Sequence, residues 1–358
     1  MKNPVNALKQ TSERYKTLDA KDRKKFWIDG LLNNAIYIIL VIFLIYTYMK
    51  NSNIASASSA VNLLNLVAAN LPMALGIGGC IVLTGTDLSA GRVVGLTGAI
   101  SASLLQATTY INKFYADMGE VPIIAVILLA MLIGGIVGLV NGFFVAKFQL
   151  HPFIVTLATQ LIVYGACLLY YMSNGNNGQP ISGLSDKYTN FVKGTILPKI
   201  GGQSIPNYVI YALIVLAIMW FIWNKTPFGK NMFAVGSNPE AAKVSGVNVF
   251  LTTVMVHTLA GITYGYTGFI DAARIASNTA NSGQNYESDA IAACVIGGVS
   301  FVGGTGTIGG VVLGVVLLRI IFVCLNYLAI DQNLQYIIKG AIILLACSID
   351  MRKYLTKK

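Results

Sequence analysis

The chain has 358 residues, of which 55% are hydrophobic and 11% are charged, and its mean hydropathy is +0.66. Soluble domains carry about 25% charged residues, so the composition excludes an ordinary soluble protein and is typical of a polytopic membrane protein. The net charge of +11 raises the question of nucleic-acid binding. Because the Lys and Arg residues lie mostly beside apolar runs, we expect no nucleic-acid partner.

Residues 1–30 hold eight basic and four acidic residues, which predicts a cytoplasmic N-terminal tail. A transmembrane helix needs about 20 apolar residues. The sequence therefore predicts an all-α polytopic membrane protein with a transmembrane domain over 31–350, a cytoplasmic tail over 351–358, and about ten transmembrane helices. The eighth is short and is expected to be broken. The ten apolar runs lie near 31–49, 58–83, 91–108, 122–146, 152–172, 207–224, 251–272, 288–302, 308–328 and 334–350.

The charges between the runs predict the orientation. With the N-terminus inside the cell, the cytoplasmic segments hold 17 Lys and Arg residues and the outer segments hold 6. Basic residues concentrate on the cytoplasmic side of membrane proteins. We therefore expect a multi-pass membrane protein with both termini cytoplasmic, and the family resemblance given below implies the bacterial inner (plasma) membrane. The long segment 173–206 is then an external loop, and 225–250 is a cytoplasmic one.

Five apolar runs precede residue 200 and five follow it, so the two halves would be inverted relative to each other. Similar stretches support an inverted five-plus-five repeat. Residues 84–90 follow the second run and 286–290 follow the seventh, and each joins acidic and small residues between two spans.

The segment 225–250 contains the start of a short helix. Ser237 or Asn238 can cap free backbone N–H groups, Pro239 suits the first helical position, and Glu240 favours the positive end of the helix dipole. Gly246 indicates the end of this helix. A helix of about two turns is not stable alone, so it serves either as an ordinary surface turn or as a docking element for another protein.

Several motifs predict no catalytic or cofactor chemistry. The run from Gly304 to Gly309 matches GxGxxG, but long apolar segments surround it where a dinucleotide fold needs strands. The segment at Phe228 lacks the glycine and hydroxyl residue of a P-loop. The five cysteines lie in apolar runs and the two histidines stand apart, so we expect no metal, no cofactor and no enzyme activity. Any ATP hydrolysis would come from a partner subunit.

Ionisable residues within membrane spans are costly and therefore informative. Asp271 and Arg274 are spaced to pair on one helix face, while Arg319 and Lys339 lie deep in the ninth and tenth runs. Structural pairing within the bundle and a functional path both remain open for these charges. The residues that we assign to the translocation path or its gating are Asp87, Ser89, Arg92, Asn141, Gln160, Tyr164, Glu287, Asp289, Asn326 and Gln335.

Four stretches and the segment 335–340 together resemble the permeases of ribose/galactoside-class ABC sugar importers, over roughly residues 60–350. They are the 225–250 segment, 84–92, 147–157 and 286–298. Arg92 in the second stretch is similar to the galactose/methyl-galactoside branch. The residues of the 225–250 segment that the resemblance assigns to contact with the ATPase are Gly236, Ser237, Asn238, Glu240, Ala241, Ala242 and Gly246.

The resemblance implies an importer with two permease chains, two ATP-binding subunits and an extracytoplasmic sugar-binding protein. The chain would be the permease, embedded in membrane lipid as a homodimer, and its sugar would be galactose or a methyl-galactoside before ribose. A gradient-driven secondary sugar transporter without an ATPase partner remains the alternative.

Overall fold

The structure, a computed structural model, describes residues 35–355. In that range the chain is helical, and its β-type pairing is limited to isolated bridges such as Ile181 with Asn278. The predicted tail over 1–30 lies outside the described residues, as do 356–358. The predicted tail over 351–358 begins as helix, because the last helix continues to Leu355.

A helix lies at each of the ten predicted apolar runs. Six of them are long and apolar enough to cross a membrane, namely α4, α6, α7, α9, α12 and α14. The crossing of α3, α5, α13 and α15 stays a prediction, and with it the count of ten. The bounds are α3 Ala35–Lys50, α4 Ala57–Val82, α5 Ala90–Leu104, α6 Ile123–Phe148, α7 Pro152–Met172, α9 Asn207–Lys225, α12 Val249–Ile275, α13 Tyr286–Ile296, α14 Ile308–Tyr327 and α15 Gln332–Leu355.

Three further α-helices and a short 3-10 helix (Ser52–Ala55) lie between these in the described range. The segment 225–250 holds two, α10 (Pro227–Ser237) and α11 (Pro239–Val244), where the sequence predicted one. The segment 173–206 holds α8 (Asp186–Lys193), which the sequence analysis left as loop. The side chain of Ser185 caps α8, and Tyr188 and Val192 bury its apolar side. The sequence contains these helix signals, but the polar composition of the segment favoured a loop over a helix.

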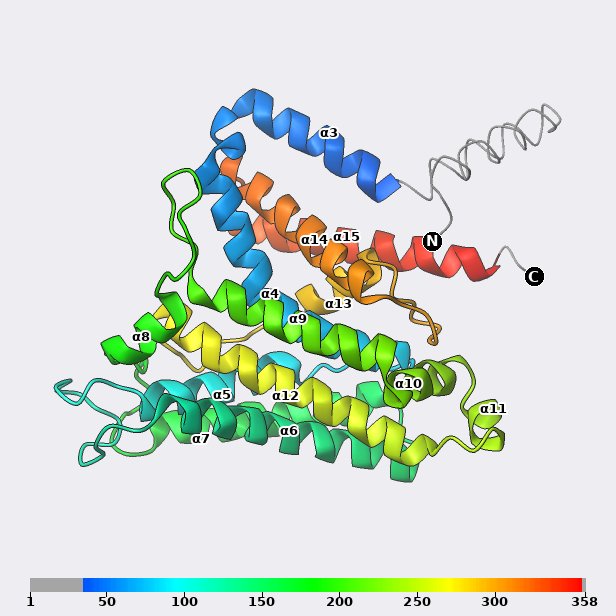
Figure 1. Ribbon diagram of the computed structural model, residues 1–358, viewed down its shortest axis with the longest axis horizontal. Coiled ribbons are helices and arrows are strands. Elements are labelled where there is room, and N and C mark those ends of the chain that lie inside the picture. Colours follow the sequence, from blue (N-terminus) through cyan, green and yellow to red (C-terminus); the bar gives the residue numbers. More distant parts are fainter. Residues whose placement is uncertain (1–34, 356–358) are drawn as a thin grey trace.

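The helices form a bundle with two distinct ends (Figure 1). We call them the α8 end and the α11 end, because α8 lies beyond one end and α10 and α11 lie beyond the other. The yellow helix α12 runs between the ends and packs on α4, α5 and α6. Small residues bring α12 and α6 together, since a Cβ on Gly134 would lie 2.1 Å from the carbonyl oxygen of Gly261. Such close backbone approach is typical of helices packed in membranes.

Two helix pairs run in opposite senses. The long α4 ends at the α11 end and the short α5 turns back from it, whereas the long α12 ends at the α8 end and the short α13 turns back. The starts of α5 and α13 meet, because a Cβ on Gly91 would lie 2.2 Å from a carboxylate oxygen of Glu287. This arrangement agrees with the inverted repeat, which as a whole stays a prediction.

Four of the five thiols are buried, as the sequence suggested. Cys80, Cys167, Cys294 and Cys324 are enclosed by the bundle, and Cys347 is partly exposed. Burial among apolar helices leaves these cysteines as small core residues.

Candidate functional site

The first part of the site is the segment 225–250, which we call the coupling segment. Helix α10 begins after Thr226, whose hydroxyl accepts a hydrogen bond from the backbone N–H of Gly229. Helix α11 begins after Asn238, whose side-chain oxygen accepts from the N–H of Ala241 at 3.0 Å. The predicted helix start is therefore confirmed with Asn238 as the cap, while Ser237 is instead the last residue of α10.

The coupling segment has a buried and an exposed side. Gly236 and Ala242 are buried against the bundle, and Gly246 ends the turn after α11 with a φ of +84°. Glu240 and Ala241 are exposed, and the apolar side chain of Val244 is 90% exposed. A short helix seated on the bundle thus presents a free outer face that includes an unpartnered apolar side chain.

The second part of the site is a buried hydrogen-bond network at the start of α5. The carboxylate of Asp87 accepts from the backbone N–H and the hydroxyl of Ser89 at 2.9 and 2.6 Å. Asn141 on α6 donates to the hydroxyl of Ser89 at 3.0 Å and accepts from the hydroxyl of Thr159 on α7 at 2.6 Å. Thr156 adds a bond from the N–H of Leu88 at 3.1 Å. We call Asp87, Ser89, Asn141 and Thr159 the α5 network.

The network joins three predicted path residues directly, and Thr159 and the neighbouring Thr156 on α7 add contacts to it. Asp87, Ser89 and Asn141 were predicted and lie together, with Asp87 and Asn141 fully buried. Thr156 and Thr159 lie about one helical turn apart on α7, and their polarity within an apolar run was the only available signal. Buried polar groups inside a membrane bundle need such partners.

Arg92 and Tyr164 form a neighbouring pair. The guanidinium carbon of Arg92 lies 4.0 Å from the centre of the Tyr164 ring, within the range of a cation–π contact. Glu287, at the start of α13, is buried and lies against Gly91. Gln160 is half-buried on α7 and joins neither the α5 network nor the charged cluster below.

The third part of the site is a charged cluster at the start of α13. Asp289 forms an ion pair with Arg319 of α14, with 3.0 Å between their atoms, and a second with Lys339 of α15. Arg319 also donates to the side-chain oxygen of Asn70 on α4 at 2.9 Å. We call Asp289, Arg319 and Lys339 the α13 cluster. Arg319 and Lys339, the basic residues predicted to lie deep in apolar runs, are therefore paired, and both pair with the same carboxylate.

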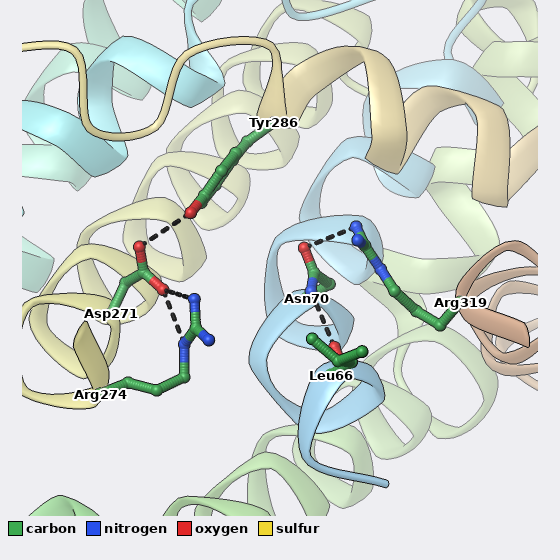
Figure 2. A network of polar contacts seen from close by, with 6 residues as sticks. All are labelled: Leu66, Asn70, Asp271, Arg274, Tyr286 and Arg319. Carbon is green, nitrogen blue, oxygen red and sulfur yellow. Dashed lines mark hydrogen bonds and ion pairs between the residues drawn. The ribbon is translucent and has the colours of Figure 1, made fainter. Parts of the chain in front are cut away.

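Figure 2 shows how two sets of polar contacts hold this region. Arg319 reaches toward Asn70, which itself donates to the carbonyl oxygen of Leu66 one turn earlier on α4. Asp271 lies between Arg274 and Tyr286, accepting at 2.6 and 2.9 Å from Arg274 and at 3.0 Å from the Tyr286 hydroxyl. The predicted pairing of Asp271 with Arg274 is confirmed, and Tyr286 ties it to α13.

A pocket of about 430 Å³ opens beside the α13 cluster. Asn326 of α14 and Gln335 of α15, both predicted path residues, lie in its wall and are joined by a hydrogen bond of 3.0 Å. The aromatic rings of Phe322 and Tyr336 lie within 5.5 Å of the Lys339 ammonium group. The wall consists of Leu66, Asp289, Arg319, Phe322, Asn326, Ile330, Gln332, Gln335, Tyr336 and Lys339.

The wall chemistry suits a small hydroxylated solute. Amide groups, charged hydrogen-bonding groups and an aromatic ring face one space, and polar groups of this kind fix the orientation of a ligand in a pocket. Within 35–355, no group of three or more His, Cys, Asp or Glu residues is arranged to hold a metal ion.

Comparison with known proteins gives a consistent result. The profile of the family described as branched-chain amino acid transport system / permease component matches residues 59–347. The galactose/methyl galactoside import permease proteins MglC of Haemophilus influenzae and Escherichia coli (strain K12) are 46% and 45% identical to the chain. These matches cover 92% and 94% of the chain and 97% and 98% of the relatives.

A more distant relative has a different sugar in its name. The ribose import permease protein RbsC of Bacillus subtilis (strain 168) is 33% identical over 93% of the chain and 97% of its own length. No solved structure matches the chain.

Proposed function

The chain belongs to the family described as branched-chain amino acid transport system / permease component, and we propose that it imports galactose or a methyl galactoside as the membrane subunit of an ATP-driven importer. The observation that carries the proposal is the 45% identity with the Escherichia coli galactose/methyl galactoside permease over 94% of the chain. The lower identity of 33% to a ribose permease places ribose behind galactose as the substrate.

The coupling segment is the proposed docking site for an ATP-binding subunit. The resemblance assigns the contact to Gly236, Ser237, Asn238, Glu240, Ala241, Ala242 and Gly246. Of these, Gly236 and Ala242 are buried and would hold the segment on the bundle, while the other five are exposed and, with Val244, could meet the subunit. An exposed apolar residue at the end of a small helix is a suitable anchor for a protein interface. In this proposal the α11 end is cytoplasmic, as the basic residues of the sequence predict.

The α8 end then faces the outside and receives the sugar from an extracytoplasmic binding protein. The segment 173–206, with α8 as its ordered part, is the proposed contact region. Lipid would cover the apolar faces of α6 and α7, where large side chains such as Leu128 and Ile162 are 59% and 70% exposed.

A second copy of the chain would cover the pocket beside the α13 cluster. Charged groups within a membrane face protein or water rather than lipid. Because the pocket is open on this chain and holds Asp289, Asn326 and Gln335 in its wall, a homodimer would enclose it and the sugar would pass there. The α5 network, with Arg92, Tyr164 and Glu287 beside it, would position the helices that line this path. Gln160 remains a predicted path residue, although it joins neither the α5 network nor the α13 cluster.

The proposal is tested by purifying the tagged chain in mild detergent together with its candidate ATP-binding subunit. We expect the subunit to copurify with the wild-type chain and to be lost with Val244→Asp, since a charge would disrupt an apolar contact. Ile196→Asp is the matched control, because Ile196 is 76% exposed in the segment 173–206 at the opposite end. Equal recovery with both variants would refute the docking role.

Transport by the reconstituted complex tests the energy source and the sugar. Uptake of radiolabelled galactose into vesicles is expected to need ATP and to continue when the proton gradient is collapsed. Unlabelled methyl galactoside should compete with it more strongly than ribose. Uptake that follows the gradient and ignores ATP would instead identify a secondary transporter, which the comparisons do not support.

A further inference from the structure

The end of α10 meets the bundle at two glycines, through backbone atoms at Gly236 and through Ser237 at Gly304. A Cβ on Gly236 would lie 1.9 Å from the carbonyl oxygen of Val82 and 2.9 Å from the backbone nitrogen of Gly304. The N–H of Gly304 donates to the same Val82 oxygen at 2.9 Å. A Cβ on Gly304 would lie 2.7 Å from the Cα of Ser237. We call Val82, Gly236 and Gly304 the glycine junction.

The junction requires glycine for two physical reasons. A Cβ on Gly236 would overlap backbone atoms of Val82 and Gly304, and a Cβ on Gly304 would overlap the hydroxyl oxygen of Ser237 at 2.1 Å as well as its Cα. Gly304 also has a φ of +66°, and its neighbour Gly303 has a φ of +89°, a backbone region that glycine adopts without strain. The GxGxxG pattern that begins at Gly304 therefore has a structural purpose unrelated to nucleotides.

The junction joins three elements that are far apart in sequence. Val82 is the last residue of α4, Gly236 lies at the end of α10, and Gly304 lies in the connection between α13 and α14. Close contact that is mainly between backbones leaves only the short Ser237 side chain to absorb a displacement, and well-packed interiors transmit strain. A movement of α10 would therefore displace the α13–α14 connection directly.

The connection is itself tied closely to the end of α13. The N–H of Val299 donates to the carbonyl oxygen of Cys294 at 2.9 Å, and the N–H of Gly303 donates to that of Ser300 at 3.1 Å. The other end of α13 carries Asp289, which is held by Arg319 and Lys339 beside the pocket. Helix α13 and the connection that follows it thus lead together from the coupling segment to the pocket wall.

We propose that the glycine junction and α13 form a relay that carries movement of the coupling segment to the α13 cluster and so opens or closes the pocket to its solute. The proposal rests on the docking role of the coupling segment, and it adds Gly236 and Gly304 as positioning residues for transport. ATP binding by the docked subunit would shift α10, the junction would shift α13, and Asp289 would change its position in the pocket wall.

The test compares Gly304→Ala with Gly309→Ala in the reconstituted complex. Gly309 lies five residues further along, and a Cβ there would meet nothing within 4 Å. Three quantities are measured for each variant: copurification of the ATP-binding subunit, ATP hydrolysis, and sugar uptake. For Gly304→Ala we expect copurification and hydrolysis to be retained and uptake per ATP hydrolysed to fall about tenfold. Gly309→Ala is expected to match the wild type.

Uptake per ATP equal in the two variants would overturn the relay. Loss of the subunit from the wild-type chain, or its retention by Val244→Asp, would overturn the proposed docking itself, so the two failures are distinguishable.

If Gly304→Ala does not insert into the membrane, hydrogen exchange on the wild-type complex tests the relay instead. The backbone amides of 286–304 should change their exchange rate when a non-hydrolysable ATP analogue binds, while the amides of α6 should change less. Unchanged exchange over 286–304 would refute the relay.

Discussion

The starts of α5 and α13 lie against each other and hold their polar groups in opposite ways. The α5 network is closed: Asp87 and Asn141 are fully buried and joined through the hydroxyl of Ser89. The α13 cluster is open: Arg319 and Lys339 share the carboxylate of Asp289 at the edge of a pocket of about 430 Å³. A closed network fixes the position of its helices, whereas charges beside an opening can respond to a solute or to a moving element. The first region therefore supports the structure, and the second is the better candidate for the transport path.

The largest effect is expected from Asp289→Asn. The substitution leaves Arg319 and Lys339 without their shared carboxylate, and removal of one partner from a buried ion pair costs about 3 kcal/mol. Sugar uptake should be abolished and the midpoint of thermal unfolding in detergent should fall. Glu120→Gln is the control, because it breaks the solvent-exposed pair of Glu120 with Lys187 from outside the segment 173–206 and should change neither quantity. Normal uptake by Asp289→Asn would remove the α13 cluster from the path.

Asn141→Leu tests the other side of the comparison. It leaves the hydroxyl groups of Ser89 and Thr159 without their amide partner, and such side-chain hydrogen bonds between membrane helices contribute about 0.6 kcal/mol each. We expect a lower thermal midpoint and less protein in the membrane, with an unchanged KM for uptake. A changed KM with an unchanged midpoint would mean that the α5 network contacts the sugar, and the contrast between the two regions would fail.

Gln335→Ala should act on the solute with little effect on stability. Gln335 is half-buried in the pocket wall and donates to Asn326, so its removal enlarges the pocket and frees one amide. Loss of one hydrogen bond to a solute is worth about 1 kcal/mol, which corresponds to a KM several-fold higher. The thermal midpoint should stay within error of the wild type. An unchanged KM would exclude Gln335 from the path.

The smallest effect is expected far from both regions, at Asn238→Ala. Loss of the cap removes about 1 kcal/mol from the stability of α11, which weakens docking without preventing it. Recovery of the ATP-binding subunit should fall partly for Asn238→Ala and be restored for Asn238→Asp, which keeps a capping oxygen. A thermal midpoint that shifts as much as in Asn141→Leu would show that α11 also stabilises the bundle.

Local features of the fold were predictable because they depend on neighbouring residues. The positions of the ten helices follow from apolar runs, and the start of α11 follows from Asn238 and Pro239. Helices α8 and α10 were missed although Ser185 and Thr226 cap them. Both lie in polar segments, where hydropathy gives no signal and the helices are stabilised by packing on the rest of the chain.

The site was predictable as a set of residues but not as a set of contacts. The cost of an ionisable group beside membrane spans identified Asp87, polarity within an apolar run identified Asn141, and the resemblance of 286–298 identified Asp289. The sequence could not indicate that Asp289 pairs with Arg319, because that contact depends on how α13 and α14 cross. It also led to Gln160, which is half-buried on α7 and joins neither polar group.

The buried thiols make the chain convenient for chemical labelling. Thiols enclosed by apolar helices react slowly, so Cys80, Cys167, Cys294 and Cys324 would contribute little background to a maleimide reaction. With Cys347 replaced, a reporter cysteine at Val244 or Ile196 would report the sidedness of each end of the bundle in intact cells. A reagent that cannot cross the membrane should modify the reporter at 196 and spare the one at 244.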